Sequence, residues 1–286
     1  MIAWFPDQHL IRMLGPQCFR RINPEGHDYA YDQYRKEQRI RLDITFLLAH
    51  LHLLPEAIMA TTRAIEIAEA VDTIRAILRT RISQVVHIPN FWQHVRTGTL
   101  KITERDSETV RLQDGSTLTR DVDRIIDYGP MPGYDMLDPG AHEIARQLKY
   151  AFTALNAILS FGGLNINPLT IWDKDRRHVA KVFERGLKKA AASFDEIQNV
   201  RQFIGPVGIA TLAGWGRHPG APANFHAALD GRTLQLGRSP HDYQKIIVPE
   251  TFFAVLPSLP RIGKINIDDA PDVHLDPPAQ DEEEIA

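Results

Sequence analysis

The spacing of apolar residues predicts that the first part of the chain is helical. From Tyr29 to Leu53 apolar side chains recur at intervals of three and four residues, which places them on one face of a helix. A second such pattern runs from Pro55 to Thr80, with the proline in the first turn, where its missing N–H is tolerated. Because Leu54-Pro55 separates the two patterns, we expect an antiparallel helical hairpin over residues 1–85.

The pattern changes after Pro89 to short runs rich in β-branched residues. Turn residues separate these runs, and Asp114-Gly115 is a strong signal for a two-residue hairpin turn. The expected strands are 99–103, 109–113, 116–119 and 122–128. We therefore expect an antiparallel β-meander at about 99–128, within a segment that runs from 86 to 134.

Helical periodicity returns in the second half of the chain. One helix is expected from Ala141 to Leu159, ending at Gly162-Gly163, where glycine can adopt the left-handed cap conformation. A second helix is expected from Asp173 to about Phe194, with acidic residues at its positive N-terminal end.

Glycine and proline interrupt the pattern after this helix. The stretch at 205–222 contains so many of both that we expect a long loop, followed by strands at 233–236 and 245–248. The fold class that these elements indicate is α+β. We expect a single domain over residues 1–267, made of the helical hairpin, the meander segment and an α/β region at 135–267.

The composition of the chain predicts a buried core, a disordered tail and a cellular compartment. A hydrophobic content of 43% in 286 residues is enough to bury a sizeable core. The net charge is −3, yet residues 268–286 hold eight acids and no Lys or Arg, so we expect a disordered acidic tail. No apolar run reaches the roughly 20 residues of a membrane span, so we expect a cytoplasmic protein without membrane contact. Cys18 is the only cysteine and is expected to be a packing residue.

Four segments carry a resemblance to a known family. They are PNFWQHVRTG at 89–98, VRLQDGSTL at 110–118, DRIIDYG at 123–129 and YQKIIVPETFF at 243–253. In this order they resemble the C-terminal half of the flavin-containing monooxygenases of secondary metabolism. The resemblance implies a partial FAD/NAD(P)-binding-like architecture, FAD and NADPH as cofactors, and oxygenation of a small organic metabolite as substrate. It places Tyr128 and Gly129 near the cofactor and names no catalytic residue.

The chain departs from this family at two places. The family's Ala-Thr-Gly is Asp127-Tyr128-Gly129 here, and no G-x-G-x-x-G fingerprint follows a first strand. The nearest candidate, GWGRHPG at 214–220, has its third glycine one residue late. The chain is therefore interpreted as a truncated relative of this family, or as a derivative whose redox activity is lost or altered. A non-redox enzyme activity is an alternative.

A second hypothesis comes from the charges of the helix that starts at Asp173. Basic residues recur there at intervals of three and four, on the face opposite the apolar one. They are Lys174, Arg177, Lys181, Arg185 and Lys188. Such a stripe suits a non-catalytic interaction module that binds nucleic acid or a protein partner, although an ordinary solvated helix face has the same pattern.

Three further groups of residues are weaker candidates. His218, His226 and His241 with Asp242 match no zinc spacing, so no metal site is predicted. His142-Glu143 at a helix start suits capping better than acid/base chemistry, because adjacent helical residues point in different directions. The aromatic residues of the second half suit either an apolar pocket or an ordinary core; they are Trp172, Trp215, Phe225, Phe252 and Phe253.

Overall fold

The fold is α+β, as the sequence predicts. The computed structural model describes residues 2–5, 10–13, 17–18, 21, 24–86, 95–113, 115–221 and 223–263. The residues at 89–94, Asp114 and the acidic tail at 268–286, all part of the predictions above, lie outside the described residues. Contacts group the chain into two compact units, and the single domain expected over residues 1–267 stays a prediction.

Unit 1 comprises residues 1–54, 157–184 and 261–286. It contains the antiparallel pair β1 (Ile2–Phe5) and β2 (Leu10–Met13), the helix α2 (Pro24–His50) and the short 3-10 helices η2 (Leu51–Leu53) and η4 (Gly163–Asn165). The end of α5 (Ile144–Ser160) and the start of α6 (Asp173–Ile204) also belong to it. Cys18 is exposed, so its expected packing role is wrong.

The backbone is helical at Leu54-Pro55, and the helical hairpin expected over residues 1–85 stays a prediction. The chain is helical from α2 through η2 into α3 (Leu54–Val86), whose first turn contains Pro55. Proline has no N–H to donate to the carbonyl of Leu51, and the N–H of Leu54 donates to it instead. One 3-10 turn therefore replaces the α-helical hydrogen bond, and the helix continues.

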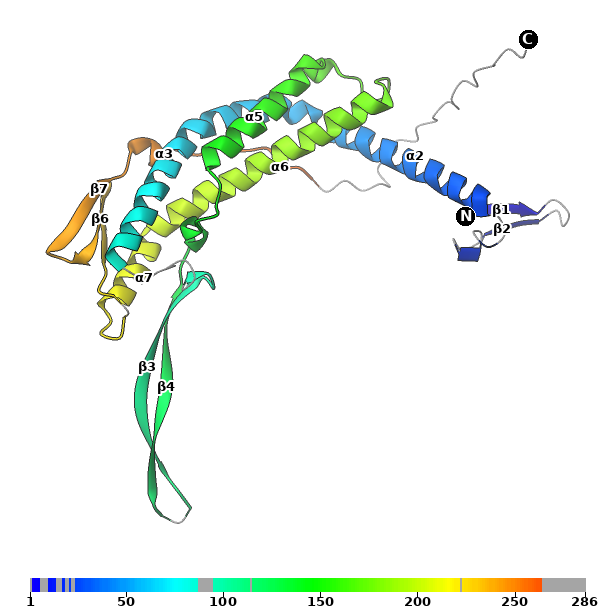
Figure 1. The fold of residues 1–286 in the computed structure, drawn as a ribbon. Helices are drawn as coiled ribbons and strands as arrows, with labels where there is room; N and C mark the ends of the chain where they lie inside the picture. Colours follow the sequence, from blue (N-terminus) through cyan, green and yellow to red (C-terminus); the bar gives the residue numbers. More distant parts are fainter. Residues whose placement is uncertain are drawn as a thin grey trace, which may run out of the picture. The chain divides into compact units, whose positions relative to one another are not determined.

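Unit 2 comprises residues 55–156 and 185–260. Its further elements are β3 (Thr99–Arg111), β4 (Thr117–Pro130), η3 (Tyr134–Leu137), α7 (Pro206–Arg217), β5 (His226–Asp230), β6 (Thr233–Ser239), β7 (Asp242–Ile247) and α8 (Glu250–Phe253). Here α3, α5 and α6 run alongside one another and share one hydrophobic core with α7 and the C-terminal sheet (Figure 1).

A single long hairpin stands in place of the expected meander. β3 and β4 pair antiparallel from Thr99↔Pro130 to Arg111↔Thr117 and extend away from the helices (Figure 1). The base is buried through Leu100 and Ile102, whereas the part beyond is largely exposed. The residues between the expected short strands, at 104–108 and 120–121, instead pair within the ribbon, as in the 2.9 Å Arg120–Glu108 ion pair.

The expected loop at 205–222 is mostly the helix α7. Pro206 stands at its N-terminal end, where proline is favoured. Its glycines permit close packing: a Cβ on Gly208 would lie 2.1 Å from the carbonyl oxygen of Phe203, and one on Gly216 would lie 2.3 Å from that of Phe225. These glycines therefore mark contact positions within a helix rather than a loop.

The C-terminal strands form one antiparallel sheet in the order β5-β6-β7. Both predicted strands, 233–236 and 245–248, overlap β6 and β7, while β5 was not predicted. All strand pairs among the described residues are antiparallel, so these residues do not form the parallel βαβ crevice that a dinucleotide occupies.

Candidate functional site

Two helices of unit 2, α5 and α6, pack closely enough to form the walls of a groove. Both were predicted, although α6 continues to Ile204 instead of ending near Phe194. The close approach depends on Gly186 of α6, where a Cβ would lie 3.0 Å from Leu155 of α5. The predicted glycine cap of α5 is confirmed, since Gly162 and Gly163 have φ of 115° and 55°.

A polar network fixes the start of α5 against α3. The carboxylate of Asp72 accepts hydrogen bonds from the backbone N–H groups of Ile144 (3.1 Å) and Ala145 (2.8 Å). The same carboxylate lies 2.8 Å from the buried guanidinium of Arg75, which donates to the carbonyl of His142 at 2.5 Å. Asp72 thus caps α5 from another helix and places His142 and the turn after it.

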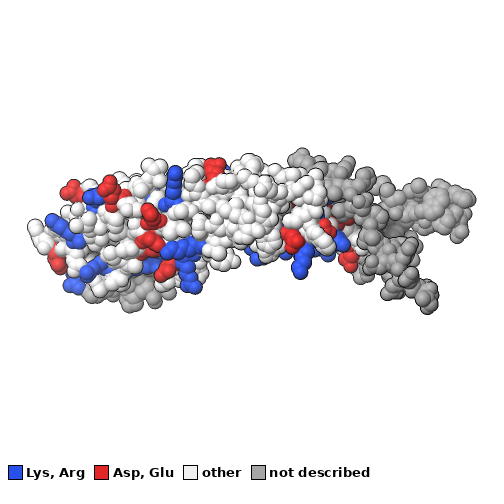
Figure 2. Space-filling view, turned by 90° about the horizontal axis from the view of Figure 1, so that it is seen from above, with Lys and Arg blue, Asp and Glu red and all other residues white. Residues whose placement is uncertain are grey.

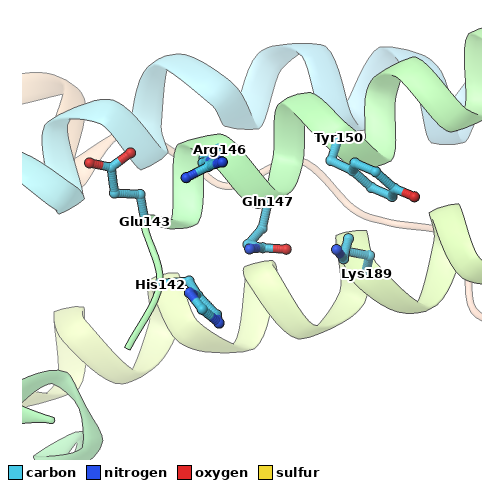
Figure 3. A pocket seen from close by; sticks show the side chains of 6 residues that line it. All are labelled: His142, Glu143, Arg146, Gln147, Tyr150 and Lys189. Carbon is cyan, nitrogen blue, oxygen red and sulfur yellow. The ribbon is translucent and has the colours of Figure 1, made fainter. Parts of the chain in front are cut away.

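The groove lies between α5 and α6 and has two adjoining hollows. The larger encloses about 460 Å³ and the smaller about 330 Å³, and both are open to solvent. Four residues line both hollows: His142, Gln147, Tyr150 and Lys189. Figure 3 shows the side chains that line the smaller hollow, from the start of α5 and from the facing turn of α6.

Cationic side chains and one tyrosine dominate the lining of this α5–α6 groove. The ammonium of Lys189 lies 4.2 Å from the ring centroid of Tyr150, a cation–π contact, and Tyr150 is 58% exposed. Arg146 lines the smaller hollow, and Arg185 and Lys188 line the larger one. The groove therefore combines an aromatic ring with cations from both helices.

Two acidic residues, Glu143 and Glu196, also line the groove. Burial raises the pKa of Glu196 above its ordinary range, although Arg75, 4.0 Å away, acts in the opposite direction. Glu196 therefore gives up its negative charge more readily than an ordinary glutamate when the pH falls.

The predicted basic stripe on α6 is exposed along its whole length, opposite buried Val179, Phe183 and Leu187. Only its last two members, Arg185 and Lys188, line the groove. Burial raises the pKa of Asp43 of α2, and the nearby positive charges of Arg177 and Lys181 offset part of that rise.

Sequence reasoning missed Arg146, Tyr150 and Lys189. A signal was available for the first two, because His142, Arg146 and Tyr150 follow one another at intervals of four residues, which puts them on one face of a helix. Lys189 follows Lys188 and falls between the stripe and the apolar face. Only the packing of α6 on α5 brings it against Tyr150.

On the face of the molecule that Figure 2 shows, charges of both signs are interspersed. The α5–α6 groove is a concave place where cations from two elements converge around an aromatic ring.

Tyr128 and Gly129, the predicted cofactor residues, are at the base of the hairpin. The ring of Tyr128 makes an edge contact with His218 and would lie 3.3 Å from a Cβ on Gly214. Gly129 has φ +85°, its N–H donates to Asp127, and a Cβ there would meet nothing within 4 Å. Tyr128 is therefore packed against α7 and Gly129 shapes the backbone, and their place near a flavin stays a prediction.

The other candidates separate in the structure. His218 lies 3.3 Å from Glu104, while the ring of His226 is tilted by 48° against that of Tyr243. Within the described ranges no three potential metal ligands gather. Three aromatic residues are buried in the core, namely Trp215, Phe225 and Phe252. Trp172 is 82% exposed.

Comparison of the chain with protein-family models, with curated proteins and with solved structures gives no match. One helical run, Tyr31–Val85, has the length and apolar composition that a membrane span needs. Half of the most apolar 18-residue segment of this run is buried inside the protein, and the core helix of a soluble protein can have the same length and composition.

Proposed function

We propose that this protein is an interaction module that binds single-stranded nucleic acid in the α5–α6 groove. The observation that carries the proposal is the exposed ring of Tyr150 among Arg146, Arg185, Lys188 and Lys189. Single-strand binding requires cations that follow the phosphates and an aromatic ring on which a base stacks. An acidic protein segment would use the cations but would gain less from the ring.

The test is titration of a fluorescently labelled oligonucleotide with the protein at several salt concentrations. Arg185→Gln should lower affinity and reduce the slope of log K against log salt by about 0.7, the value for one phosphate contact on a single strand. Tyr150→Ala should lower affinity by about fivefold or more without changing that slope, because stacking releases no counterions. Arg185→Glu combined with Lys188→Glu should abolish binding at moderate salt.

Matched controls lie elsewhere on the chain. Tyr34 of α2 is 56% exposed, so Tyr34→Ala removes a tyrosine of similar exposure and should leave binding unchanged. Lys245→Glu reverses a charge on an exposed side chain of β7 and serves the same purpose. If the protein binds no oligonucleotide at low salt, the proposal is wrong; binding of an acidic peptide in its place would assign the groove to a protein partner.

Flavin-dependent monooxygenase activity stays a prediction that rests on the resemblance alone. The antiparallel sheets and the packed ring of Tyr128 lend it no support among the described residues. Yellow absorbance of the purified protein, or uptake of FAD on titration, would restore it. A small-molecule substrate and NADPH depend on that same result.

A further inference from the structure

The connection between α5 and α6 exposes apolar side chains and carries no charge. No Asp, Glu, Lys, Arg or His occurs from Tyr150 to Trp172. Within this stretch four side chains of unit 1 are 47–54% exposed and Trp172 is 82% exposed. These five residues, here called the apolar tip, are Leu159, Phe161, Leu164, Leu169 and Trp172. Five exposed apolar side chains within the 14 residues 159–172 make this stretch a candidate surface for a partner.

The backbone of the apolar tip is held in place by a buried arginine. The guanidinium of Arg176 donates to the carbonyls of Pro168 and Ile171, both at 2.7 Å, and lies 2.6 Å from Asp173. The side chain of Asn167 accepts a further hydrogen bond from the N–H of Leu169 at 3.0 Å. The exposure of Leu169 and Trp172 is therefore a property of an ordered loop, because several hydrogen bonds fix the backbone that carries them.

Exposed cations follow the apolar tip on α6. Lys174, Arg177 and Lys181 lie within the first three turns after it, and all three are exposed. Asp43 is near the last two and offsets part of their charge, and Asp175 is half-buried. An uncharged tip that contains tryptophan, followed by cations, complements the surface of an anionic bilayer, with the aromatic ring at headgroup depth and the cations at the lipid phosphates.

We infer that the apolar tip docks this protein on an anionic membrane surface. The sequence criteria gave no membrane contact because they require about 20 consecutive apolar residues. The apolar side chains of the tip are separated along an ordered loop, so they do not meet that length criterion. The inference is independent of the α5–α6 groove, because it uses residues of unit 1 only.

The experiment is co-sedimentation of the full chain with vesicles of phosphatidylcholine alone and of equal parts phosphatidylcholine and phosphatidylglycerol. The protein should bind the mixed vesicles and leave the neutral ones largely unbound. Trp172→Glu should lower binding to the mixed vesicles by about tenfold or more, since it places a charge at the point of insertion. Lys174→Gln should lower binding roughly fivefold, the usual contribution of one cation near an anionic surface.

Val255→Glu is the matched control, since Val255 is 92% exposed in unit 2 and its substitution should leave vesicle binding unchanged. Phe161→Ser provides a second tip variant, and circular dichroism of each variant verifies folding. Failure to bind mixed vesicles, or equal binding by Trp172→Glu, would overturn the inference. So would self-association without lipid that Trp172→Glu abolishes, because the tip would then be an interface between two copies.

Discussion

The carboxylate of Asp72 accepts hydrogen bonds from two N–H groups at the start of α5 and pairs with the buried guanidinium of Arg75. A carboxylate at a helix N-terminus satisfies donors that the helix itself cannot satisfy and stabilises the positive end of its dipole. The buried guanidinium needs that same carboxylate, because burial of an arginine without an acid is costly. Asp72 therefore contributes both to the stability of unit 2 and to the position of the groove.

Asp72→Ala should lower the free energy of unfolding by about 3 kcal/mol, because it leaves two backbone donors without an acceptor and removes the nearest acid from Arg75. Asp72→Asn retains one acceptor and should cost less. Urea unfolding followed by circular dichroism measures both. Thr73→Ala alters the neighbouring, exposed residue and should cost only about 0.5 kcal/mol or less. A loss equal to that of Asp72→Ala would mean that the cap is not the cause.

Glu196 gives a pH dependence whose sign follows from its raised pKa. Since the folded state holds the proton more tightly than the unfolded state, the stability contributed by protonated Glu196 is lost as the pH rises through the folded pKa. Glu196→Gln should therefore raise the unfolding midpoint at neutral pH by about one or two degrees, as suits a half-exposed group. The difference in midpoint between variant and wild type should vanish below about pH 4, where Glu196 is neutral in the folded and the unfolded state.

Thermal unfolding of Glu196→Gln and wild type across this pH range measures the effect. Glu143→Gln removes the same charge from an exposed side chain of the groove and is the control. A gain that persists at acidic pH would show that the glutamine acts through packing rather than through charge.

At the scale of the elements, apolar periodicity located most helices and strands. It failed where glycine lies inside a helix and where charged residues lie inside a strand. Helix α5 and its cap follow directly from apolar spacing and Gly162-Gly163. Helix α7 was missed because Gly208 and Gly216 permit close contacts inside a helix, which a count of glycines cannot reveal. The meander was wrong because the residues at 104–108 and 120–121, expected between strands, pair within one long ribbon.

The candidate groove was only partly visible in the sequence for a related reason. Arg185 and Lys188 belong to a stripe that spacing on one helix reveals. Tyr150 and Lys189 meet only through the packing of two helices, and that packing depends on Gly186. A pattern along one element cannot specify which residues of another element it faces.

The exposed half of the β3–β4 hairpin should be dispensable for folding. Arg105 and Asp123 are paired, so residues 106–122 can be replaced by Asn-Gly, a two-residue turn suited to joining paired strands. The deleted part contains only two half-buried apolar side chains, those of Val110 and Val122. The unfolding midpoint should change by no more than about 2–3 °C in a circular dichroism melt.

Replacement of buried Leu100 at the base of the hairpin by alanine is the matched contrast. It should destabilise the protein by about 2–5 kcal/mol because it leaves a cavity in the core. If the shortened hairpin destabilises as much as this substitution, then the outer ribbon belongs to the folding core.

At the scale of the whole molecule, the distribution of charge matters more than its sum. The chain has a net charge of −3, and without the eight acids of residues 268–286 its 33 basic and 28 acidic residues leave +5. Net charge sets the long-range attraction or repulsion of an anionic ligand, whereas contacts in a groove set the short-range affinity. The acidic residues at the end of the chain should therefore oppose nucleic-acid binding at a distance.

Deletion of residues 268–286 should raise the affinity for the labelled oligonucleotide several-fold at low salt, and the gain should disappear at high salt, where charges beyond about 3 Å are screened. A full-length variant with the eight acids replaced by Asn and Gln should reproduce the gain, because it removes the charge and keeps the length. If the deletion enhances binding and the neutral variant does not, these residues obstruct the groove by bulk. If neither variant changes affinity while Arg185→Gln does, local contacts alone govern the binding.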